Sequence, residues 1–179
     1  MKKNFFFARL TRENFDSHSL DAFRRHQSIS QVWRRVEGQW QLVPMDFEEN
    51  WDLETCREIA ADVEAHMEAD QSAFGCFHGP RLVGFVTVSH NAFGKTARYL
   101  ELVCFQVSEE YRGQGIGRTL FTMATEEARA LGAEKLYISA HSSRETQATY
   151  KALGCVHARE INETLAAEEP FDVQLEYVL

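Results

Sequence analysis

The feature that most constrains the fold is an apolar run that passes directly into a glycine-rich loop and then into a helix. Residues 99–107 read Tyr-Leu-Glu-Leu-Val-Cys-Phe-Gln-Val, which predicts a buried strand. Glycines follow at positions 113, 115 and 117, and residues 115–131 predict a helix that Gly132 ends. Alternating glycines leave backbone N–H groups uncovered, and the helix start adds unpaired N–H groups and a partial positive charge. This arrangement is typical of a phosphate-binding site.

The glycine spacing separates this loop from two other phosphate-binding loops. A Walker A loop needs Gly-x-x-x-x-Gly-Lys and a dinucleotide-binding fingerprint needs Gly-x-Gly-x-x-Gly. Neither pattern fits residues 113–117. The sequence also lacks a His-Glu-x-x-His motif, and its four cysteines are too widely spaced to suggest a metal site. We therefore expect no metal, and we interpret the cysteines as buried free thiols in a cytoplasmic protein.

The order of the predicted elements indicates an α/β fold with a mixed, mostly antiparallel central sheet flanked by helices. Residues 73–89 predict a β-hairpin that turns at His78-Gly79-Pro80, and it leads into a strand–helix–strand unit over residues 99–140. The helix expected near the C-terminal end starts with a capping box at Ser142 and Glu145. Further strands are expected at 4–10, 135–140, 155–159 and 172–177, a second hairpin at 31–43, and helices at 14–26, 52–68 and 142–154.

Length and charge narrow the class of protein. With 179 residues, 44% of them hydrophobic, the chain suits a single domain over residues 1–179. No run approaches 18 consecutive apolar residues, so no membrane span is expected. The net charge of −8 argues against a general nucleic-acid binder, which is usually basic. Residues 46–70 hold ten acidic side chains against the single Arg57, which form either a solvated helix face or an acidic wall that attracts a cationic ligand.

The segment Arg112-Gly-Gln-Gly-Ile-Gly117 resembles the Gln/Arg-x-x-Gly-x-Gly/Ala motif of the GNAT superfamily of N-acetyltransferases. The resemblance covers residues 73–155 well, as an acetyl-CoA-binding core, and residues 1–70 only by general layout, as acceptor-side elements. In that family the loop amides bind the coenzyme A pyrophosphate. A backbone N–H near the strand end, here that of Val107, bonds the thioester carbonyl and stabilises its developing charge. The resemblance assigns cofactor binding to Gln106, Val107, Arg112, Gly113, Gln114, Gly115, Ile116, Gly117 and Arg118.

A second motif, Tyr150-Lys-Ala-Leu-Gly154, resembles the Tyr-x-x-x-Gly signature on the penultimate helix of the family. The tyrosine there donates a proton to the departing thiolate, and a phenol of pKa about 10 remains protonated at neutral pH. The alternative is an ordinary core tyrosine. The family often places an asparagine seven residues earlier, against the cofactor. Ser143 stands at that position here and is assigned the same contact.

Deprotonation of the acceptor is the third requirement, because an amine of pKa about 10.4 is almost fully protonated at pH 7. Glu101 lies six residues before Val107, and a glutamate at the matching position is the base in the histone-acetyltransferase branch of the superfamily. Other members use a chain of water molecules, which would leave Glu101 as a structural or substrate-anchoring carboxylate. His90, at the end of the neighbouring strand, is a lesser candidate.

These resemblances imply direct transfer of acetyl from acetyl-CoA to a primary amine of a small molecule, a cationic one if the acidic stretch contributes to binding. The alternatives are a protein lysine or N-terminal acetyltransferase and an acetyl-CoA sensor without turnover. Acceptor specificity would lie in residues 1–70 and in loops such as 91–98, where no code is recognisable. We expect no nucleic-acid or membrane partner. The oligomeric state stays open, although homodimers are common among similar proteins.

Overall fold

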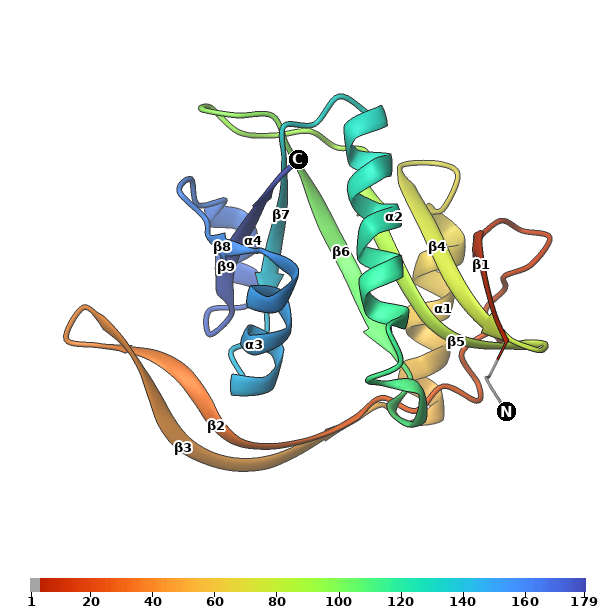
Figure 1. The fold of residues 1–179 in the computed structure, drawn as a ribbon, viewed down its shortest axis with the longest axis horizontal. Helices are drawn as coiled ribbons and strands as arrows, with labels where there is room; N and C mark the ends of the chain where they lie inside the picture. Colours follow the sequence, from red (N-terminus) through yellow and green to blue (C-terminus); the bar gives the residue numbers. More distant parts are fainter. Residues whose placement is uncertain (1–3) are drawn as a thin grey trace.

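Two β-sheets and four α-helices make up the computed structural model, which describes residues 4–179 (Figure 1). The strands are β1 (Phe5–Arg9), β2 (His26–Val36), β3 (Gln39–Asn50), β4 (Gln71–His78), β5 (Arg81–Ser89), β6 (Tyr99–Val107), β7 (Lys135–Ala140), β8 (Val156–His157) and β9 (Val173–Val178). The helices are α1 (Leu53–His66), α2 (Ile116–Ala130), α3 (Arg144–Leu153) and α4 (Glu163–Glu168), with a 3₁₀ turn at Glu109–Tyr111. The larger sheet has the order β1-β4-β5-β6-β7-β9-β8 and is antiparallel except for the pair β6–β7. This confirms the predicted fold class.

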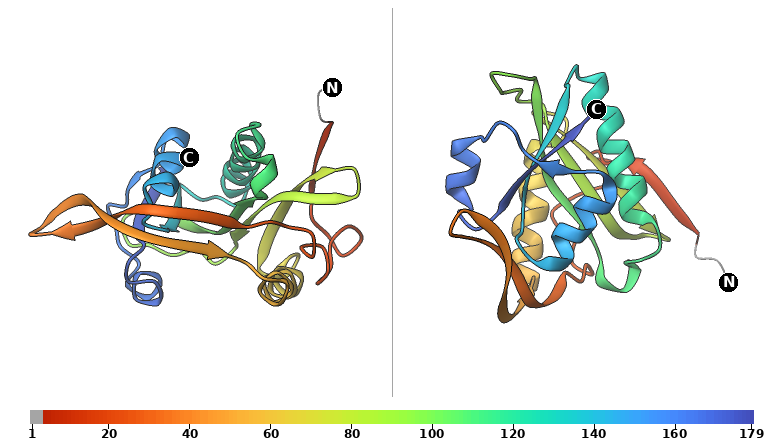
Figure 2. Two further views of the ribbon diagram at one scale, coloured as in Figure 1. Left: turned by 90° about the horizontal axis from the view of Figure 1, so that it is seen from below. Right: turned by 60° about the vertical axis from the view of Figure 1, so that its left-hand side comes forward.

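Helices cover both faces of the larger sheet. α2 and α3 lie on one face, and α1 and α4 lie on the other (Figure 2, left). α2 buries Leu120 and Phe121 in the larger apolar cluster, while α1 buries Ala60 and Val63 in a second cluster that contains Phe85 of β5. Among the described helices, none is both long and apolar enough to cross a membrane. The two clusters hold the sheet between the helical layers, so β5 and β6 are fixed from both sides.

The neighbouring strands β6 and β7 separate after a short pairing. Only Tyr99–Glu101 pairs with Lys135–Tyr137, and the two strands then diverge (Figure 1). β6 also contains a bulge, because Leu102 pairs with Val88 and Cys104 with Thr87, which leaves Val103 as an extra residue. The divergence leaves the later part of β6 with one backbone edge that faces a gap in the sheet.

The hairpin β2–β3 forms a separate sheet that crosses the open end of this gap and passes below α3 (Figures 1 and 2). Three hydrogen bonds fasten it to the loop between β7 and α3. The Trp33 N–H donates to the Ser142 carbonyl oxygen at 2.7 Å, and Arg34 Nη1 donates to Ser142 Oγ at 2.6 Å. Gln27 Nε2 donates to Ser143 Oγ at 2.9 Å. The hairpin therefore forms a fixed wall at this end of the molecule.

The prediction of a helix over residues 14–26 is wrong, since the structure shows turns there and β2 begins at His26. Short polar side chains bind the local backbone in this segment. Asn14 Oδ1 accepts from the Thr11 N–H at 2.8 Å, and Asp16 Oδ1 accepts from the His18 N–H at 2.9 Å. Such bonds offer the backbone an alternative to the helix. The apolar residues that suggested the helix are still buried in the core, namely Phe15, Leu20 and Phe23.

The other predicted elements are present, with corrections at their ends. Asp52 caps α1 as expected, since its Oδ1 accepts from the Thr55 N–H at 2.8 Å. The capping box at Ser142 is wrong, because Ser143 is the N-cap of α3 and its Oγ accepts from the Thr146 N–H at 3.2 Å. The strand expected at 155–159 is reduced to the two residues of β8, and the short helix α4 was not predicted. The division into residues 1–70 and 73–155 stays a prediction.

Candidate active site

The free edge of β6 supplies backbone donors that face the gap. The Ser108 N–H donates to the Val83 carbonyl oxygen at 2.8 Å, and the Cys104 N–H donates to Thr87 Oγ1 at 3.1 Å, so both point towards β5. Successive N–H groups of a strand point to opposite edges. The N–H groups of Phe105 and Val107 therefore point into the gap, and the assignment of the Val107 N–H as donor to the thioester carbonyl stays a prediction.

The loop after β6 is open at its glycines. Gly113 has φ 72° and Gly115 has φ 84°, a region that side-chain-bearing residues rarely adopt. A Cβ atom placed on either residue would meet nothing within 4 Å, so the loop faces free space. Gly115 is also the N-cap of α2 and has no side chain to cap the first turn. The first N–H groups of α2 are thus directed at the loop, where they favour an anion.

Three polar side chains assigned to cofactor binding hold this loop to its neighbours. Arg112 donates through Nε to the Val107 carbonyl oxygen at 3.1 Å and through Nη1 to the His26 carbonyl oxygen at 2.8 Å. Gln114 Nε2 donates to the Glu110 carbonyl oxygen at 3.2 Å. Arg118 Nη2 reaches a carbonyl oxygen at the end of α3 at 3.4 Å. Arg112 therefore joins the loop, the end of β6 and the start of β2.

The gap, the loop and the hairpin surround a cavity of about 850 Å³, a size that suits a small-molecule site. Of the predicted cofactor-binding residues, six line it: Gln106, Val107, Arg112, Gly113, Ile116 and Gly117. The other four predicted cofactor-binding residues are not among the described residues that line the cavity: Gln114, Gly115, Arg118 and Ser143. The cavity is also lined by residues in or next to the hairpin, β7, α3 and β9. These include Arg25, Gln27, Glu49, Ser139, His141, Thr146, Tyr150 and Asp172.

Tyr150 lines the cavity from α3 and packs against the free edge of β6. Its ring centroid lies 6.1 Å from that of Phe105, and only 8% of the residue is exposed. Burial raises the pKa of the Tyr150 hydroxyl above its ordinary value. The phenol therefore stays protonated throughout the neutral range, which suits a proton donor.

Glu101 and His90, the two candidate bases, lie away from this cavity. Neither is among its described lining residues. Burial, followed by the nearby charge of Glu168, raises the pKa of Glu101. His90 Nε2 is 2.8 Å from Ser72 Oγ, which donates to Glu127 Oε1 at 2.5 Å. His90 thus belongs to a polar network between β4, β5 and α2, and the role of Glu101 as a base stays a prediction.

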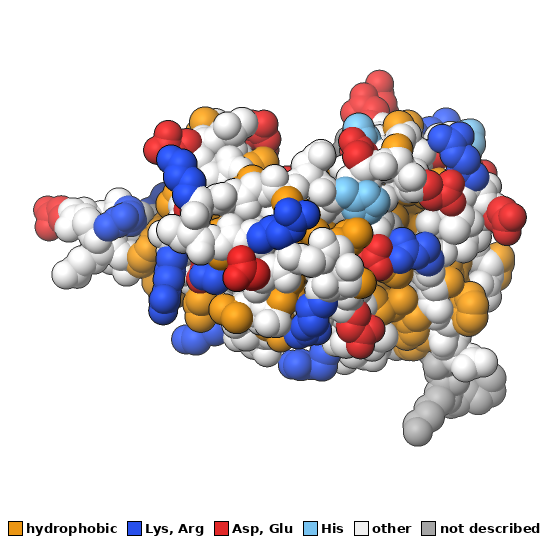
Figure 3. All heavy atoms as spheres, turned by 90° about the horizontal axis from the view of Figure 1, so that it is seen from above, with side chains coloured by type: hydrophobic (Ala, Val, Ile, Leu, Met, Phe, Trp, Pro, Cys, Tyr) orange, Lys and Arg blue, Asp and Glu red, His pale blue; other side chains and the backbone are white. Residues whose placement is uncertain are grey.

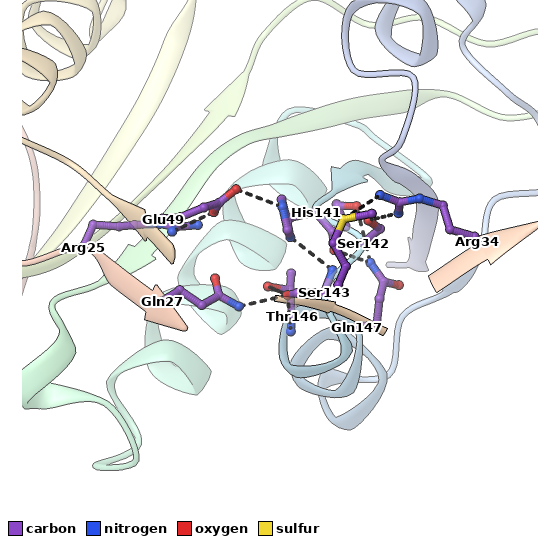
Figure 4. Close-up of polar contacts among 11 residues, drawn as sticks. Arg25, Gln27, Arg34, Glu49, His141, Ser142, Ser143, Thr146 and Gln147 are labelled. Carbon is purple, nitrogen blue, oxygen red and sulfur yellow. Dashed lines mark hydrogen bonds and ion pairs between the residues drawn. The ribbon is translucent and has the colours of Figure 1, made fainter. Parts of the chain in front are cut away.

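The cavity wall contains a polar cluster that the sequence did not indicate. Glu49 of β3 lies between Arg25 and His141 (Figure 4). Its Oε2 is 2.8 Å from Arg25 Nη1, and its Oε1 is 3.0 Å from His141 Nε2. His141 follows β7 directly, and its Nδ1 accepts from the Ser143 N–H at 3.1 Å. Glu49 and His141 are far apart in sequence, so no local motif could reveal them. The one cue in the sequence is that His141 directly follows the strand predicted at residues 135–140.

Acidic residues outnumber the two arginines, Arg25 and Arg112, among the described residues that line the cavity. Seen from above, acidic and basic side chains stand next to one another (Figure 3). Five carboxylate residues line the cavity: Glu49, Glu109, Glu145, Glu169 and Asp172. A neighbouring hollow beside α1 adds Glu58 and Asp62, and both hollows share Val103 and Cys104 of β6. Three residues of the acidic stretch 46–70 therefore face these hollows.

His26 connects the start of the hairpin to the loop. Its Nδ1 lies 3.1 Å from Glu109 Oε1, and its Nε2 lies 2.5 Å from Glu48 Oε2. The hydrogen bonds to Glu109 and then Glu48 raise the pKa of His26 above 6.5. Since its carbonyl oxygen also accepts from Arg112, the charge on His26 supports the junction that holds the loop.

We expect this junction to weaken in alkaline solution. Because the folded state raises the pKa of His26, its stabilisation is fully present below the unfolded value and is lost as pH rises through the folded pKa. The thermal midpoint of wild type should therefore exceed that of His26→Gln at about pH 6, and the difference should shrink towards about pH 9. A difference that is constant over this range would show that the charge of His26 has no role.

Known proteins resemble this chain in its sequence and in its fold. The family model described as acetyltransferase (GNAT) family matches residues 33–155. The structure is similar to that of a nourseothricin acetyltransferase, with TM-score 0.71 and 19% identity, covering 97% of this chain and 98% of that one. A putative streptothricin acetyltransferase from Bacillus anthracis, in complex with acetyl coenzyme A, has TM-score 0.69 and 12% identity, with 98% of each chain covered. An aminoglycoside 6'-N-acetyltransferase complexed with coenzyme A has TM-score 0.52 and 19% identity, with 66% of this chain and 78% of that one covered.

No curated protein matches the sequence. Among the described residues, no group of three or more histidine, cysteine, aspartate or glutamate side chains is arranged to hold a metal ion. The family model covers more than half of the chain, including β6, the glycine loop, α2 and the helix that carries Tyr150. The chain therefore belongs to the GNAT family of acetyltransferases.

Proposed function

We propose that this protein transfers acetyl from acetyl-CoA to a primary amine of a cationic small molecule by direct attack. The observation that carries the proposal is the divergence of β6 and β7. It places a free strand edge, an open glycine loop at a helix N-terminus and the Tyr150 hydroxyl around one cavity. A thioester group, a pyrophosphate and a leaving thiolate require these three features.

The fit to acetyl-CoA rests on backbone N–H groups that lie beside open space. The loop at Gly113 and Gly115 has open space where side chains would stand, and the N–H groups of the first turn of α2 would hold the pyrophosphate. The N–H groups of Phe105 and Val107 that face the gap would hold the pantetheine arm and the thioester carbonyl. Acetyl-CoA supplies the activated acetyl group. In this arrangement the Val107 N–H polarises the carbonyl, and Tyr150 donates a proton to the departing sulfur.

A covalent acetyl-cysteine route is disfavoured. Cys104 lies beside the cavity on β6, but burial raises the pKa of its thiol to about 12. The thiol is therefore protonated at neutral pH and a poor nucleophile. This supports direct attack by the amine. The four cysteines are free, which fits a reducing compartment, and we propose that the protein works in the cytoplasm.

The carboxylates around the cavity support a cationic acceptor. Glu49, Glu169 and Asp172 lie on its wall, and Glu58 and Asp62 lie in the adjoining hollow. Opposite charges in a partly enclosed site attract a cationic substrate and raise its local concentration. Two structural neighbours are named for nourseothricin and for an aminoglycoside. For this chain the proposal rests on its own carboxylates.

Thiol release from acetyl-CoA, measured against a panel of primary amines, tests the proposal. We expect turnover with one or more amines that carry an additional positive charge, and a KM for those amines that rises with salt, because exposed charges are screened. A KM that is insensitive to salt would remove the argument for a cationic acceptor. Tight binding of acetyl-CoA without thiol release from any amine or from lysine peptides would identify a sensor instead.

A further inference from the structure

Most carboxylates of the cavity are already engaged or exposed. Glu49 is paired with Arg25 and His141, and Glu109 faces His26 at 3.1 Å. Glu145 and Glu169 are exposed at the ends of their helices. A carboxylate that is ion-paired or fully hydrated is a weak base, because its charged form is already stabilised. None of these four residues is therefore both sheltered from solvent and without a charged partner.

His141 is also unsuited to be the base. Its Nδ1 accepts a hydrogen bond from the Ser143 N–H, so a ring proton lies on Nε2, which is 3.0 Å from Glu49 Oε1 (Figure 4). Neither ring nitrogen has a free lone pair directed at the cavity. The cluster Arg25–Glu49–His141 instead fixes the hairpin against the end of β7.

Asp172 is the remaining carboxylate of the cavity wall. It directly precedes β9, it is half-buried, and its Oδ2 accepts a hydrogen bond from Ser139 Oγ at 3.1 Å. Burial raises the pKa of Asp172, and the nearby charges of Glu169 and Glu49 add to this, while the Ser139 bond and His141 oppose it. Within residues 4–179, no lysine or arginine forms an ion pair with Asp172.

The segment that carries Asp172 is held in place from the hairpin. The guanidinium of Arg34 lies over the ring of Phe171, 4.6 Å from its centroid, and Arg34 also donates to Ser142 Oγ. Asp172 is one of the groups whose charge acts on Tyr150, after burial and two cysteines. The base candidate and the proton donor therefore share one cavity, where Asp172 is positioned by packing rather than by a counter-ion.

On the basis of the function proposed above, we propose that Asp172 is the base that accepts the proton of the acceptor ammonium group in this cavity. The ammonium group gives one proton to an Asp172 oxygen, which leaves a neutral amine. The amine nitrogen then forms a bond to the acetyl carbon as the carbon–sulfur bond breaks. Tyr150 gives its proton to the sulfur and receives the second proton of the nitrogen. Asp172 releases its proton to water, so one proton is lost per turnover.

Glu101 is the alternative carboxylate for this role. It lies on β6 but not among the described lining residues of the cavity, and its electrostatic neighbour is Glu168 of α4. A proton acceptor must reach the amine directly or through one water molecule. Asp172 lies on the wall of the cavity in which the amine would bind, whereas Glu101 does not, so the two residues can be separated by experiment.

The test compares Asp172→Asn, Asp172→Glu and Glu101→Gln with wild type. Acetyl-CoA is the donor, and the acceptor is the fastest amine of a panel that includes 1,3-diaminopropane, spermidine and glycine amide. Asp172→Asn keeps an acceptor for Ser139 and should lower kcat/KM for the amine about 100-fold to 1,000-fold at pH 7. The deficit should fall below about tenfold near pH 10, where the amine supplies its own neutral form. Asp172→Glu should restore most of the rate, and Glu101→Gln should stay within about threefold of wild type.

Several outcomes overturn the assignment. If Asp172→Asn turns over within about threefold of wild type, or if its deficit is independent of pH, Asp172 is not the base. If Glu101→Gln shows the pH-dependent deficit, Glu101 has the role. Wild-type protein that releases no thiol with any amine overturns the proposed function and this inference together. Thermal midpoints and acetyl-CoA affinity show whether each variant is folded, and Asp172→Glu tests the role if Asp172→Asn is not.

Discussion

Replacing Tyr150 by phenylalanine is expected to lower kcat for acetyl transfer about a hundredfold, because general acid catalysis contributes roughly that much or more. The ring remains, so its packing against Phe105 and the fold should be retained. Affinity for acetyl-CoA should stay within about threefold of wild type, since the hydroxyl acts on the leaving sulfur rather than on binding. Initial rates of thiol release and the Kd of acetyl-CoA, measured on the same preparation, check both statements.

Tyr111→Phe is the matched control for this variant. Tyr111 is also a buried tyrosine of the cavity wall, and its hydroxyl lies 3.0 Å from His78 Nδ1. Removal of that hydroxyl should affect stability by about 1 kcal/mol and leave kcat close to wild type. Unchanged turnover in Tyr150→Phe would remove Tyr150 from the mechanism. Equal losses in both variants would indicate a structural effect of the cavity tyrosines.

Replacing Gly115 by alanine should weaken acetyl-CoA binding by about tenfold or more. At φ 84° a Cβ costs ~1–2 kcal/mol, so the loop either keeps that strain or relaxes and moves the N–H groups at the start of α2. Loss of one hydrogen bond to a charged phosphate costs ~1.5–3 kcal/mol. Calorimetric titration with acetyl-CoA measures the affinity, and chemical denaturation measures the strain.

Two other glycines supply matched controls for Gly115→Ala. Gly38 at the tip of the hairpin has φ 81°, and a Cβ there would also meet nothing within 4 Å. Gly38→Ala should therefore lose similar stability and bind acetyl-CoA normally. Gly117→Ala should be tolerated in both respects, since its Cβ would lie in ordinary contact with Phe105 and Val107. Normal acetyl-CoA affinity in Gly115→Ala would remove the loop from the phosphate site.

Local patterns predicted β6, the glycine loop and α2. The apolar run of β6, the glycine loop and α2 are adjacent in sequence, so their geometry follows from short-range chemistry. The cap of α1 at Asp52 and the left-handed Gly154 at the end of α3 follow for the same reason. The same reasoning failed at residues 14–26, where an apolar spacing suited a helix but polar side chains bound the backbone in turns.

Long-range packing decided the polar wall of the cavity. Glu49, His141 and Asp172 come from β3, the end of β7 and the start of β9, and they share a wall only because the hairpin crosses the gap in the sheet. Glu101, by contrast, is close in sequence to the loop but lies on the part of β6 that still pairs with β7. The position of a residue along a strand therefore does not determine whether its side chain lines the cavity, because the neighbouring strands and the hairpin form that cavity.

The sequence by itself determined the strand, the glycine loop and the helix start between Tyr99 and Ala130, because these elements form one continuous segment whose geometry follows from local chemistry. The phosphate site assigned to this segment is a prediction from its backbone. The tertiary structure alone decided how Arg112 is used, since its guanidinium holds two backbone oxygens of β6 and β2. It also decided which carboxylates line the cavity. Burial and pairing depend on segments that are distant in the chain, and these set whether a carboxylate such as Asp172 or Glu49 is free to take a proton.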